Sequence, residues 1–359
     1  MKLVIYMNIP SHHQTQFFES LFKLNNKLKV FYYGKVGVSR KEMGWEDDIP
    51  LNSYESYIDT ESYQFNSSEL KEYIHIIPGY GHPFLVKLRN NLSRNKIKWI
   101  HWSENATPGW KWYASYHRKF IHAQFVNRYS LGALAIGEHA KKDFIRWGID
   151  KSKIGILPYS FNSLPYYPLD KEILNFKNGR KAFLFVGSLT KYKGIDILLQ
   201  AFAKEFKDNS SWCLILVGNK NLKFGYEKLA KKLSISSQVL FRGVVPSKYI
   251  SSVYSAADVF ILPSRYDGWG MVVNEAVFSQ LPVIVSDAAG SSEHLVEHGL
   301  NGFVFRSGMV NDLSSYMSAY KNGYTIKSHK KNAQEVFSKF NSDAMARHLV
   351  NTLYKWNKK

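Results

Sequence analysis

The chain has 359 residues, of which 45% are hydrophobic and 21% are charged, so it is long and apolar enough for two globular domains and is not a disordered or collagen-like chain. Its net charge of +19 is spread along the sequence rather than collected in a tail. A partner of opposite charge is therefore expected, and the charge alone leaves both nucleic acid and anionic lipid headgroups open.

Short β-branched and aromatic runs alternate with segments of helical periodicity, which predicts parallel α/β layers. The strands expected in the first half are 3–7, 28–33, 73–77, 98–102, 134–136 and 154–157. A loop-rich passage at 158–180 predicts a connection between domains. The pattern then restarts with strands at 183–186, 213–217, 239–241, 259–262, 283–284 and 302–305. Among the helical segments are 15–23, 141–147, 271–280 and 342–356.

Cysteine usage and the start of the chain bear on its location. Cys213 is the only cysteine, and it lies in a strand-like run, which favours a buried structural thiol over a nucleophile. The first apolar run is too short for a signal peptide, and no stretch is long enough for a membrane-spanning helix. These features predict a cytoplasmic protein.

Asp267 and Glu275 bracket the most informative segment, with seven residues between them. Asp267 lies in a glycine-rich turn after an apolar strand, and Glu275 lies one turn into the helix expected at 271–280. Free N–H groups and the dipole at a helix start favour an anion, most often phosphate. Carboxylates beside such a site fit a phosphate ester that also carries sugar hydroxyls, as a nucleotide-sugar does. The alternative is that Asp267 caps the turn and Glu275 is a solvated helix residue.

Two other strand ends carry candidate ligand groups. Strand 183–186 is followed by Gly187, Ser188 and a loop with two lysines. Lys193 precedes a glycine that lets the backbone approach a ligand, so this lysine is a candidate for a diphosphate, whereas Lys191 is interpreted as a solvated loop residue. Strand 239–241 leads to Gly243, after which the backbone is free to hydrogen-bond a flat base.

Taken in order, these motifs resemble those of a known family. They are Gly187…Lys193-Gly194, Phe241-Arg242-Gly243, the Asp267–Glu275 pair, Leu281-Pro282-Val283 and Gly299-Leu300-Asn301-Gly302-Phe303. Together they resemble the donor domain of the retaining glycosyltransferases of family 4, over residues 181–305 and the final helix. The resemblance implies the α/β fold called GT-B, in which two doubly wound Rossmann-like domains face each other across a cleft.

The resemblance also implies domain roles. We expect an N-terminal acceptor-binding domain at 1–165 and a C-terminal donor-binding domain at 166–335. The remaining segment, 336–359, is expected to be a helix that packs back toward the first domain.

The same resemblance implies roles for site residues. Asp267 would contact the hydroxyls of the donor sugar, Glu275 the ribose hydroxyls, and Lys193 would neutralise the diphosphate leaving group. The other expected donor-binding residues are Gly187, Ser188, Gly243, Val244, Gly268, Trp269, Gly270, Met271 and Val272. The chain departs from the family at two positions: Asp267 is one methylene shorter than the usual glutamate, and Ser188 stands where many members carry an arginine.

The first half offers candidates for the acceptor side. Glu104 follows the strand expected at 98–102 and is predicted to be catalytic together with Asp267 and Lys193. His13, His82 and His101 are further candidates on the acceptor side. The alternative for His13 is a solvated loop position, and His101 lies within its strand.

An aromatic stripe with cations between its members is expected near residue 116. Trp110, Tyr113, Tyr116, Phe120 and Gln124 fall at near-helical spacing, and Lys111, His117, Arg118, Lys119 and His122 lie between them; Lys87, Arg89, Arg94, Lys96 and Lys98 precede them. This combination is typical of an anionic membrane surface. A domain helix with its stripe in the core is the alternative.

The function that the resemblance implies is that of a retaining hexosyltransferase of the EC 2.4 class. It would move a hexose from a UDP- or GDP-sugar to a glycan acceptor, on a polyprenyl lipid, in bacterial surface polysaccharide or lipopolysaccharide synthesis at the inner face of the membrane. No cofactor is expected, and the lack of an Asp-x-Asp motif between apolar strands predicts metal independence. One alternative is another GT-B enzyme, such as a nucleotide-sugar 2-epimerase. The other is a nucleic-acid-binding protein, which only the net charge suggests and no sequence motif supports.

Overall fold

The computed structural model describes residues 1–42, 44–45, 49–63, 67–107, 109–110, 114–219, 224–321 and 323–358; within these ranges, the side chains at positions 39, 67, 68, 323 and 324 are not described. The chain forms two compact units. The first consists of Met1–Val36, Asp47–Asn162 and Asn341–Lys359, and the second of Gly37–Glu46 and Ser163–Phe340.

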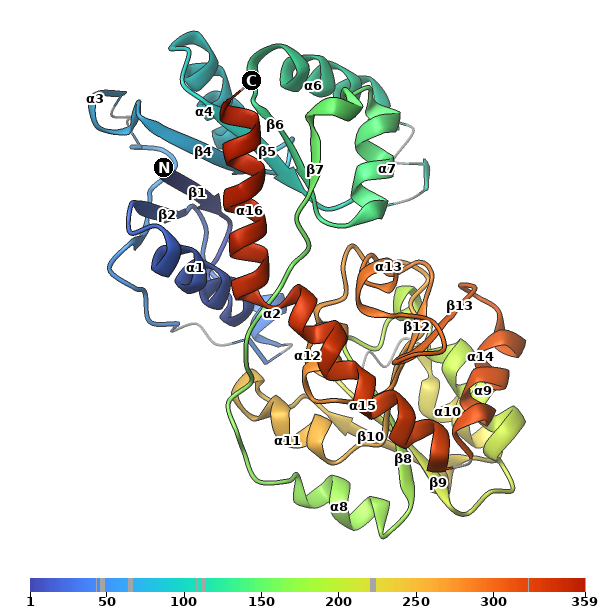
Figure 1. Cartoon of the computed structure of the whole chain (residues 1–359). Helices are drawn as coiled ribbons and strands as arrows, with labels where there is room; N and C mark the ends of the chain where they lie inside the picture. The colour runs from blue at the N-terminus through green and yellow to red at the C-terminus, as the bar shows by residue number, and fades with distance from the viewer. Residues whose placement is uncertain are drawn as a thin grey trace. The chain divides into compact units, whose positions relative to one another are not determined.

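The first unit is a parallel sheet flanked by helices (Figure 1). Its described strands follow the order β3-β2-β1-β4-β5-β6-β7, so β1 is internal and the chain winds outward from it in both directions. The strands are β1 (Lys2–Met7), β2 (Leu28–Tyr32), β3 (Glu55–Tyr57), β4 (Tyr73–Pro78), β5 (Trp99–Ser103), β6 (Gly132–Ala135) and β7 (Ile154–Ile156). The helices are α1 (His12–Leu24), α3 (Ser67–Leu70), α4 (Pro83–Arg94), α6 (Tyr116–Tyr129), α7 (Glu138–Trp147) and α16 (Ser342–Asn357).

The second unit repeats this plan with the described strand order β10-β9-β8-β11-β12-β13, again parallel throughout. The strands are β8 (Lys181–Val186), β9 (Trp212–Val217), β10 (Val239–Gly243), β11 (Val259–Leu262), β12 (Val283–Ser286) and β13 (Gly302–Phe305). The helices are α2 (Val38–Lys41), α8 (Lys171–Lys177), α9 (Ile195–Phe206), α10 (Tyr226–Lys232), α11 (Ile250–Ser255), α12 (Met271–Phe278), α13 (Ser292–Leu295), α14 (Val310–Ser318) and α15 (Gly323–Phe340). Short 3-10 turns include η2 (Lys191–Lys193) at the carboxyl side of β8.

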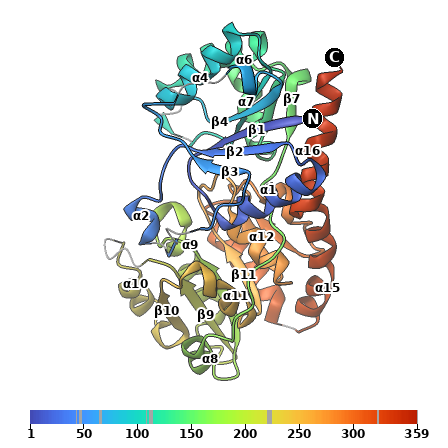
Figure 2. The same cartoon turned by 90° about the vertical axis from the view of Figure 1, so that its left-hand side faces the viewer.

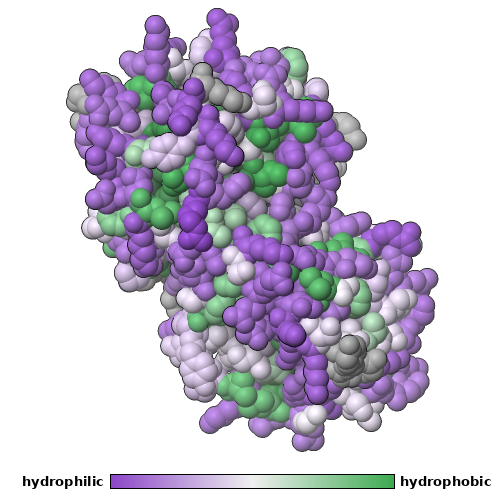
Figure 3. All heavy atoms as spheres, in the orientation of Figure 1, coloured by the Kyte–Doolittle hydropathy of each residue, from purple (hydrophilic) through white to green (hydrophobic). Residues whose placement is uncertain are grey.

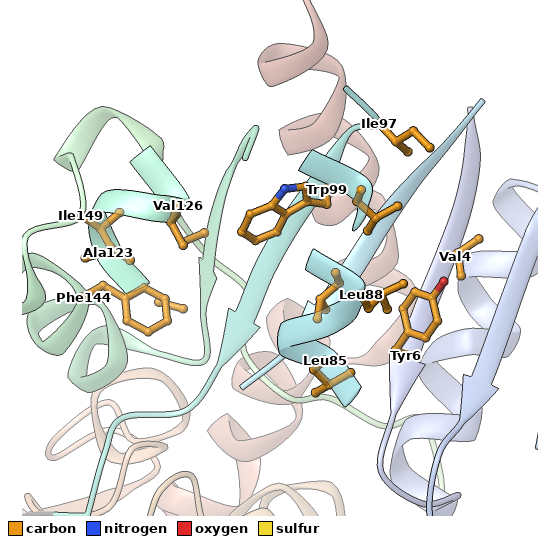
Figure 4. Packing of buried hydrophobic residues seen from close by; sticks show 14 of the residues in the cluster. Val4, Tyr6, Leu85, Leu88, Ile97, Trp99, Ala123, Val126, Phe144 and Ile149 are labelled. Carbon is orange, nitrogen blue, oxygen red and sulfur yellow. The ribbon is translucent and has the colours of Figure 1, made fainter. Parts of the chain in front are cut away.

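Each sheet is buried between its helices because its strands are almost wholly apolar. In the first unit, Val4, Tyr6 and Trp99 project from the sheet against Leu85 and Leu88 of α4 (Figure 4). The six residues of β9 are all buried, and Cys213 is one of them. Burial raises the pKa of the Cys213 thiol to about 11, which fits the predicted structural thiol rather than a nucleophile.

The last helix belongs to the first unit. Figures 1 and 2 both show α16 beside α1, and the two helices pack against each other. The backbone N–H of Ser342 donates to Asn162 Oδ1 at 2.9 Å, and the His348 ring bonds the carbonyl of Ile156 at 2.9 Å. The chain therefore returns to the first sheet after it has completed the second.

The predicted doubly wound parallel fold is confirmed, and each predicted strand is present with ends shifted by a few residues at most. Strand β3 and helix α8 are among the described elements that were not predicted. Strand β3 is short and polar, and its Glu55 is buried because it accepts hydrogen bonds from Tyr32 and Asn52. Helix α8 lies within the passage predicted as a loop; Asp170 caps it by accepting from the N–H of Ile173 at 3.0 Å.

Hydrophilic side chains cover most of the face shown in Figure 3, with smaller apolar areas between them. Among the described residues, no helix is both long enough and apolar enough to cross a membrane.

Candidate functional site

The predicted donor residues lie at the carboxyl edge of the second sheet. Because its strands are parallel, the loops that follow them meet at one edge, where doubly wound folds bind ligands. Strands β8 and β11 are neighbours in the middle of this sheet. The loop after β8 carries Lys193, and the loop after β11 carries Asp267.

Lys193 and Asp267 form an ion pair across these two loops. Lys193 Nζ lies 2.5 Å from Asp267 Oδ2, with the side chains 24% and 14% exposed. The next residue, Gly194, has φ +69°, and a Cβ there would come within 2.0 Å of the carbonyl oxygen of Pro263. Only glycine allows this close approach, so the turn that carries the lysine lies directly against the end of β11.

A second ion pair fixes the same two loops, and sequence reasoning missed it. Arg265 donates to both carboxylate oxygens of Asp196 at 2.7 Å, and its Nη1 also donates to the carbonyl of Lys191 at 2.9 Å. Burial raises the pKa of the Asp196 carboxyl, but the bonds and charge of Arg265 outweigh this and lower the pKa below its ordinary value. This bidentate pair holds the turn of Lys193 in place.

Residues 288–291, which follow β12, support the loop of Asp267 from the other side, and this segment was also missed. The N–H of Asp267 donates to the carbonyl of Ala288 at 3.2 Å, and Gly290 donates back to Asp267 at 3.2 Å. A Cβ on Gly290 would come within 2.2 Å of the carbonyl oxygen of Gly268, so this position also requires glycine. The glycine after the strand was the available signal, because a glycine at a strand exit often marks close backbone contact.

Helix α12 begins where the sequence predicts it, with Gly270 as its N-cap residue and Met271 as its first residue. The indole of Trp269 is buried and donates to Asn274 Oδ1 at 2.8 Å. Since Gly268, Trp269, Gly270, Met271 and Val272 surround the helix start, their backbone N–H groups are the natural contacts for an anion.

Glu275 is buried rather than solvated. It is 6% exposed, and one of its carboxylate oxygens accepts a hydrogen bond from Tyr254 Oη at 2.5 Å. Burial, followed by the charge of Glu275, raises the pKa of the Tyr254 phenol well above its ordinary value. The alternative of a solvated helix residue is therefore wrong.

The remaining predicted donor residues stand at the ends of β8 and β10. Gly187 follows β8 and donates its N–H to the carbonyl of Val217 at 2.9 Å, and Ser188 comes next. Gly243 ends β10, and Val244 begins the loop that follows. All four lie at the same edge of the sheet as the Lys193–Asp267 pair.

In the first unit, three of the predicted acceptor-side residues lie at the carboxyl edge of the sheet. His13 is near the start of α1 after β1, and its ring packs edge-on against Phe161. His82 is exposed after β4 and lies against Tyr33. Glu104 directly follows β5 and is half-buried.

His101, in contrast, lies inside the first unit. It is 0% exposed, shares hydrogen bonds with Ser103 Oγ at 3.0 Å and His122 at 3.3 Å, and burial lowers its pKa well below the ordinary value. His122 is nearly buried, and burial lowers its pKa to about 3. The two rings form a neutral pair behind the edge of the sheet.

The predicted basic, aromatic surface is partly corrected. Tyr116, Phe120 and Gln124 are exposed on α6, which argues against the alternative of a stripe in the core; Lys111 and Tyr113 lie outside the described residues. Lys119 is 1% exposed with its ammonium over the ring of Trp147, so neither it nor His122 belongs to the surface.

Arg89 does not belong to this surface either. It is 3% exposed and donates to the carbonyls of Gly79 and Tyr80 at 2.9 and 2.8 Å. Its interior partners are backbone carbonyls, which a count of sequence charges does not reveal. Exposed basic and apolar side chains remain on α4 and α6: Lys87, Arg94, His117, Arg118, Phe120 and Ile121.

The arrangement in the second unit is suited to an anionic ester. It offers a lysine, a helix start with free N–H groups and two carboxylates, which can accept hydrogen bonds from hydroxyls. Within the described ranges, no group of three or more His, Cys, Asp or Glu side chains could hold a metal ion.

The segment that contains this site is similar to known proteins. Residues 167–336 match the family described as Glycosyl transferases group 1. An uncharacterized glycosyltransferase of Methanocaldococcus jannaschii is 28% identical over 214 residues, which is 56% of this chain and 53% of that protein. The D-inositol 3-phosphate glycosyltransferase of Nocardia farcinica is 28% identical over 194 residues, or 51% of this chain and 43% of the relative. The chain thus matches about half the length of these curated relatives, or less.

Solved structures resemble the chain over almost its whole length. Anabaena HepE in complex with UDP and glucose has a TM-score of 0.73 at 18% identity, covering 99% of this chain and 100% of that one. WaaG, a glycosyltransferase involved in lipopolysaccharide biosynthesis, has a TM-score of 0.65 at 17% identity, covering 98% and 99%. Such likeness establishes the fold. The chain has the two-domain GT-B fold, and its residues 167–336 match the glycosyltransferase group 1 family.

Proposed function

We propose that this protein is a retaining glycosyltransferase of family 4 that transfers a hexose from a UDP- or GDP-sugar to a glycan acceptor. The observation that carries the proposal is the Lys193–Asp267 pair, which lies beside the start of α12 in the group 1 domain. The relatives support the choice of donor, because structures of HepE contain UDP and UDP-glucose.

The proposed reaction needs charge stabilisation more than covalent help from side chains. The bond between the anomeric carbon and the oxygen of the distal phosphate breaks, this oxygen keeps the electron pair, and the sugar becomes oxocarbenium-like. The acceptor hydroxyl oxygen then bonds to the anomeric carbon, and its proton passes to the departing phosphate oxygen. Lys193 and the N–H groups of residues 268–272 would stabilise the departing diphosphate. Asp267 would hold sugar hydroxyls and Glu275 ribose hydroxyls, and no metal ion or other cofactor is required in this scheme.

The other donor contacts are proposed at the neighbouring strand ends. Gly187 and Ser188 would lie near the phosphates, and Gly243 and Val244 would offer backbone groups to the base. Their common position at the carboxyl edge of the sheet supports this assignment.

The first unit is proposed to bind the acceptor. Glu104 would be its catalytic contact, with His13 and His82 beside the acceptor at the same edge of the first sheet. His101 is buried and does not reach this edge. It is proposed to position Ser103, at the end of β5, through their hydrogen bond.

We further propose that the acceptor is a polyprenyl-linked glycan of bacterial surface polysaccharide or lipopolysaccharide synthesis, and that the protein is cytoplasmic and binds the inner face of the membrane peripherally. Exposed apolar and cationic side chains on α4 and α6 support this, because their combination fits an anionic lipid surface. The WaaG resemblance is in keeping with such a setting.

Donor binding followed by turnover tests the function. A panel of UDP- and GDP-sugars is screened by thermal shift, because a ligand that binds only the folded state raises the melting temperature. The stabilising donor is then incubated with and without a lipid-linked glycan, and nucleoside diphosphate release is measured. Release that depends on the glycan supports the proposal, whereas equal turnover with donor and water alone points to a GT-B enzyme without an acceptor, such as an epimerase.

A further inference from the structure

A buried serine near the start of α12 has no role in the contacts described so far. Ser291 is 0% exposed, and its hydroxyl has no hydrogen-bond partner in the part of the chain that the structure describes. A buried hydroxyl without a partner destabilises a folded protein, and nearly all such groups are satisfied in native structures. The hydroxyl is therefore a candidate for contact with a bound molecule.

This hydroxyl lies at the N-terminal end of the helix. The point that a Cβ on Gly270 would occupy is 3.3 Å from Ser291 Oγ and 3.5 Å from Asp267 Oδ2. Gly270 is the N-cap residue of α12, and Asp267 is the partner of Lys193. The serine, the carboxylate and the helix start thus share one small region.

The backbone holds Ser291 in this place. Its N–H donates to the carbonyl of Trp269 at 2.9 Å, and the preceding Gly290 donates to the carbonyl of Asp267 at 3.2 Å. Two consecutive bonds to the loop of the candidate site restrict the position of the hydroxyl before any ligand arrives. A group held in this way loses little freedom when it binds.

We propose that Ser291 is a further donor-binding residue, whose hydroxyl donates a hydrogen bond to an oxygen of the distal phosphate of a nucleoside diphosphate at the start of α12. The inference rests on the proposed function. The helix start attracts the phosphate, and the serine adds a neutral donor beside it. In the free protein the Lys193–Asp267 pair occupies this region, and a phosphate that takes Lys193 from Asp267 gives access to the hydroxyl.

The neighbouring serine provides a matched control. Ser292 is 1% exposed, and its hydroxyl is also without a hydrogen-bond partner among the described residues. It begins α13, one residue further along the chain. Ser292→Ala therefore removes the same buried group without touching the hydroxyl beside Gly270.

The test is titration calorimetry of the full chain with UDP, GDP and the corresponding monophosphates. For the diphosphate that the unchanged protein binds, Ser291→Ala is expected to raise Kd about tenfold, the loss typical of one hydrogen bond to a charged group. Affinity for the monophosphate, which lacks the distal phosphate, should stay the same. Ser292→Ala should bind both ligands like the unchanged protein. The melting temperature of ligand-free Ser291→Ala should not fall, because the lost hydroxyl has no partner to leave behind.

Several results would overturn the inference. Equal diphosphate affinity in Ser291→Ala and Ser292→Ala would remove Ser291 from the site, and an equal loss for monophosphate and diphosphate would refute its contact with the distal phosphate. If Ser291→Ala fails to fold, Ser291→Gly, which also lacks the hydroxyl, is used instead. The same changes in Kd for diphosphate and monophosphate are expected of it. A failure of the unchanged protein to bind any nucleoside diphosphate would instead refute the proposed function, and this inference with it.

Discussion

Lys193 Nζ lies 2.5 Å from Asp267 Oδ2, so the lysine expected to bind a diphosphate is already paired with the carboxylate expected to bind the sugar. Both side chains are mostly buried, which strengthens their attraction relative to a surface pair. A diphosphate must therefore compete with Asp267 for the ammonium group. Asp267 is then expected to have a second effect besides sugar contact, because its competition for Lys193 lowers the affinity of the site for the nucleoside diphosphate product.

Replacing Asp267 should separate these two effects. Asp267→Asn removes the charge that competes for Lys193, so binding of a sugar-free nucleoside diphosphate should tighten about three- to tenfold, while transfer from the nucleotide-sugar should fall because the sugar contact is weakened. Calorimetry with UDP or GDP measures the first effect, and initial rates measure the second. Asp312→Asn is the control, because it removes a carboxylate paired with Arg306 in the same unit and changes no side chain of the two ion pairs at the site. Weaker diphosphate binding in Asp267→Asn would contradict the competition.

Glu275 is best tested by a change that keeps its hydrogen bond. Because Tyr254 Oη donates to Glu275 at 2.5 Å, Glu275→Ala would leave this buried phenol with only the 3.4 Å contact to the Val272 carbonyl and cost about 1–3 kcal/mol of stability. Glu275→Gln keeps an acceptor for Tyr254 but loses the carboxylate. It should weaken binding of the nucleotide at least tenfold, by calorimetry, with circular dichroism unchanged.

Tyr254→Phe completes this test. It removes the hydroxyl from the other side of the bond and leaves the carboxylate in place. Tyr254→Phe should lower the melting temperature, and it should weaken nucleotide binding less than Glu275→Gln does. Normal affinity in Glu275→Gln would refute the assignment of Glu275 to the ribose.

The fold was predictable from the sequence because its strands are buried on both faces. Runs such as 213–217 and 259–262 are continuously apolar, and they match β9 and β11 closely. The polar edge strand β3 lacks this signal and was missed. At the site, the residue pattern singled out the paired carboxylates and Lys193, the resemblance implied their roles, and the structure brings Lys193 and Asp267 together.

The supporting contacts of the site could not be predicted in the same way. Arg265 and Asp196 are 69 residues apart in the sequence, and no local pattern links them. Arg89 and Lys119 were assigned to the surface because charged side chains are mostly exposed. Inside the unit, however, Arg89 donates hydrogen bonds to backbone carbonyls and the Lys119 ammonium lies over the Trp147 ring. Burial of a charge depends on partners that only the folded chain brings together.

Membrane binding should depend on exposed apolar side chains of the first unit. Trp110 is 74% exposed and Ile121 is 55% exposed, near the exposed cations of α6. Trp110→Ser with Ile121→Ser should reduce binding to vesicles containing anionic phosphatidylglycerol at least tenfold in a sedimentation assay, because each large apolar side chain that enters the lipid contributes about 1.5–3 kcal/mol. Raising the salt concentration from about 0.1 M to about 0.5 M should also weaken binding.

The control is Tyr166→Ser, since Tyr166 is 88% exposed in the second unit and has no expected part in lipid contact. This variant should sediment with vesicles like the unchanged protein. Equal binding by the double variant and the control would show that the apolar residues of the first unit do not anchor the protein.

The buried histidine pair should make stability depend on pH in the acid range. Burial lowers the pKa of His122 to about 3 and that of His101 well below its ordinary value, whereas both titrate at about 6.5 in the unfolded chain. Below about pH 6.5 these histidines therefore bind protons in the unfolded state but not in the folded state, and the free energy of unfolding falls as the pH falls toward 3. At about pH 5 the loss is about 2 kcal/mol for His122.

His122→Gln keeps a polar side chain that can hydrogen-bond His101 but does not titrate. Its melting temperature should drop less between about pH 7 and about pH 5 than that of the unchanged protein. His117→Gln changes an exposed histidine on the same helix and is the matched control. If both variants follow the curve of the unchanged protein, protonation of His122 does not limit stability in acid, and the neutral pair inferred from the buried 3.3 Å contact is wrong.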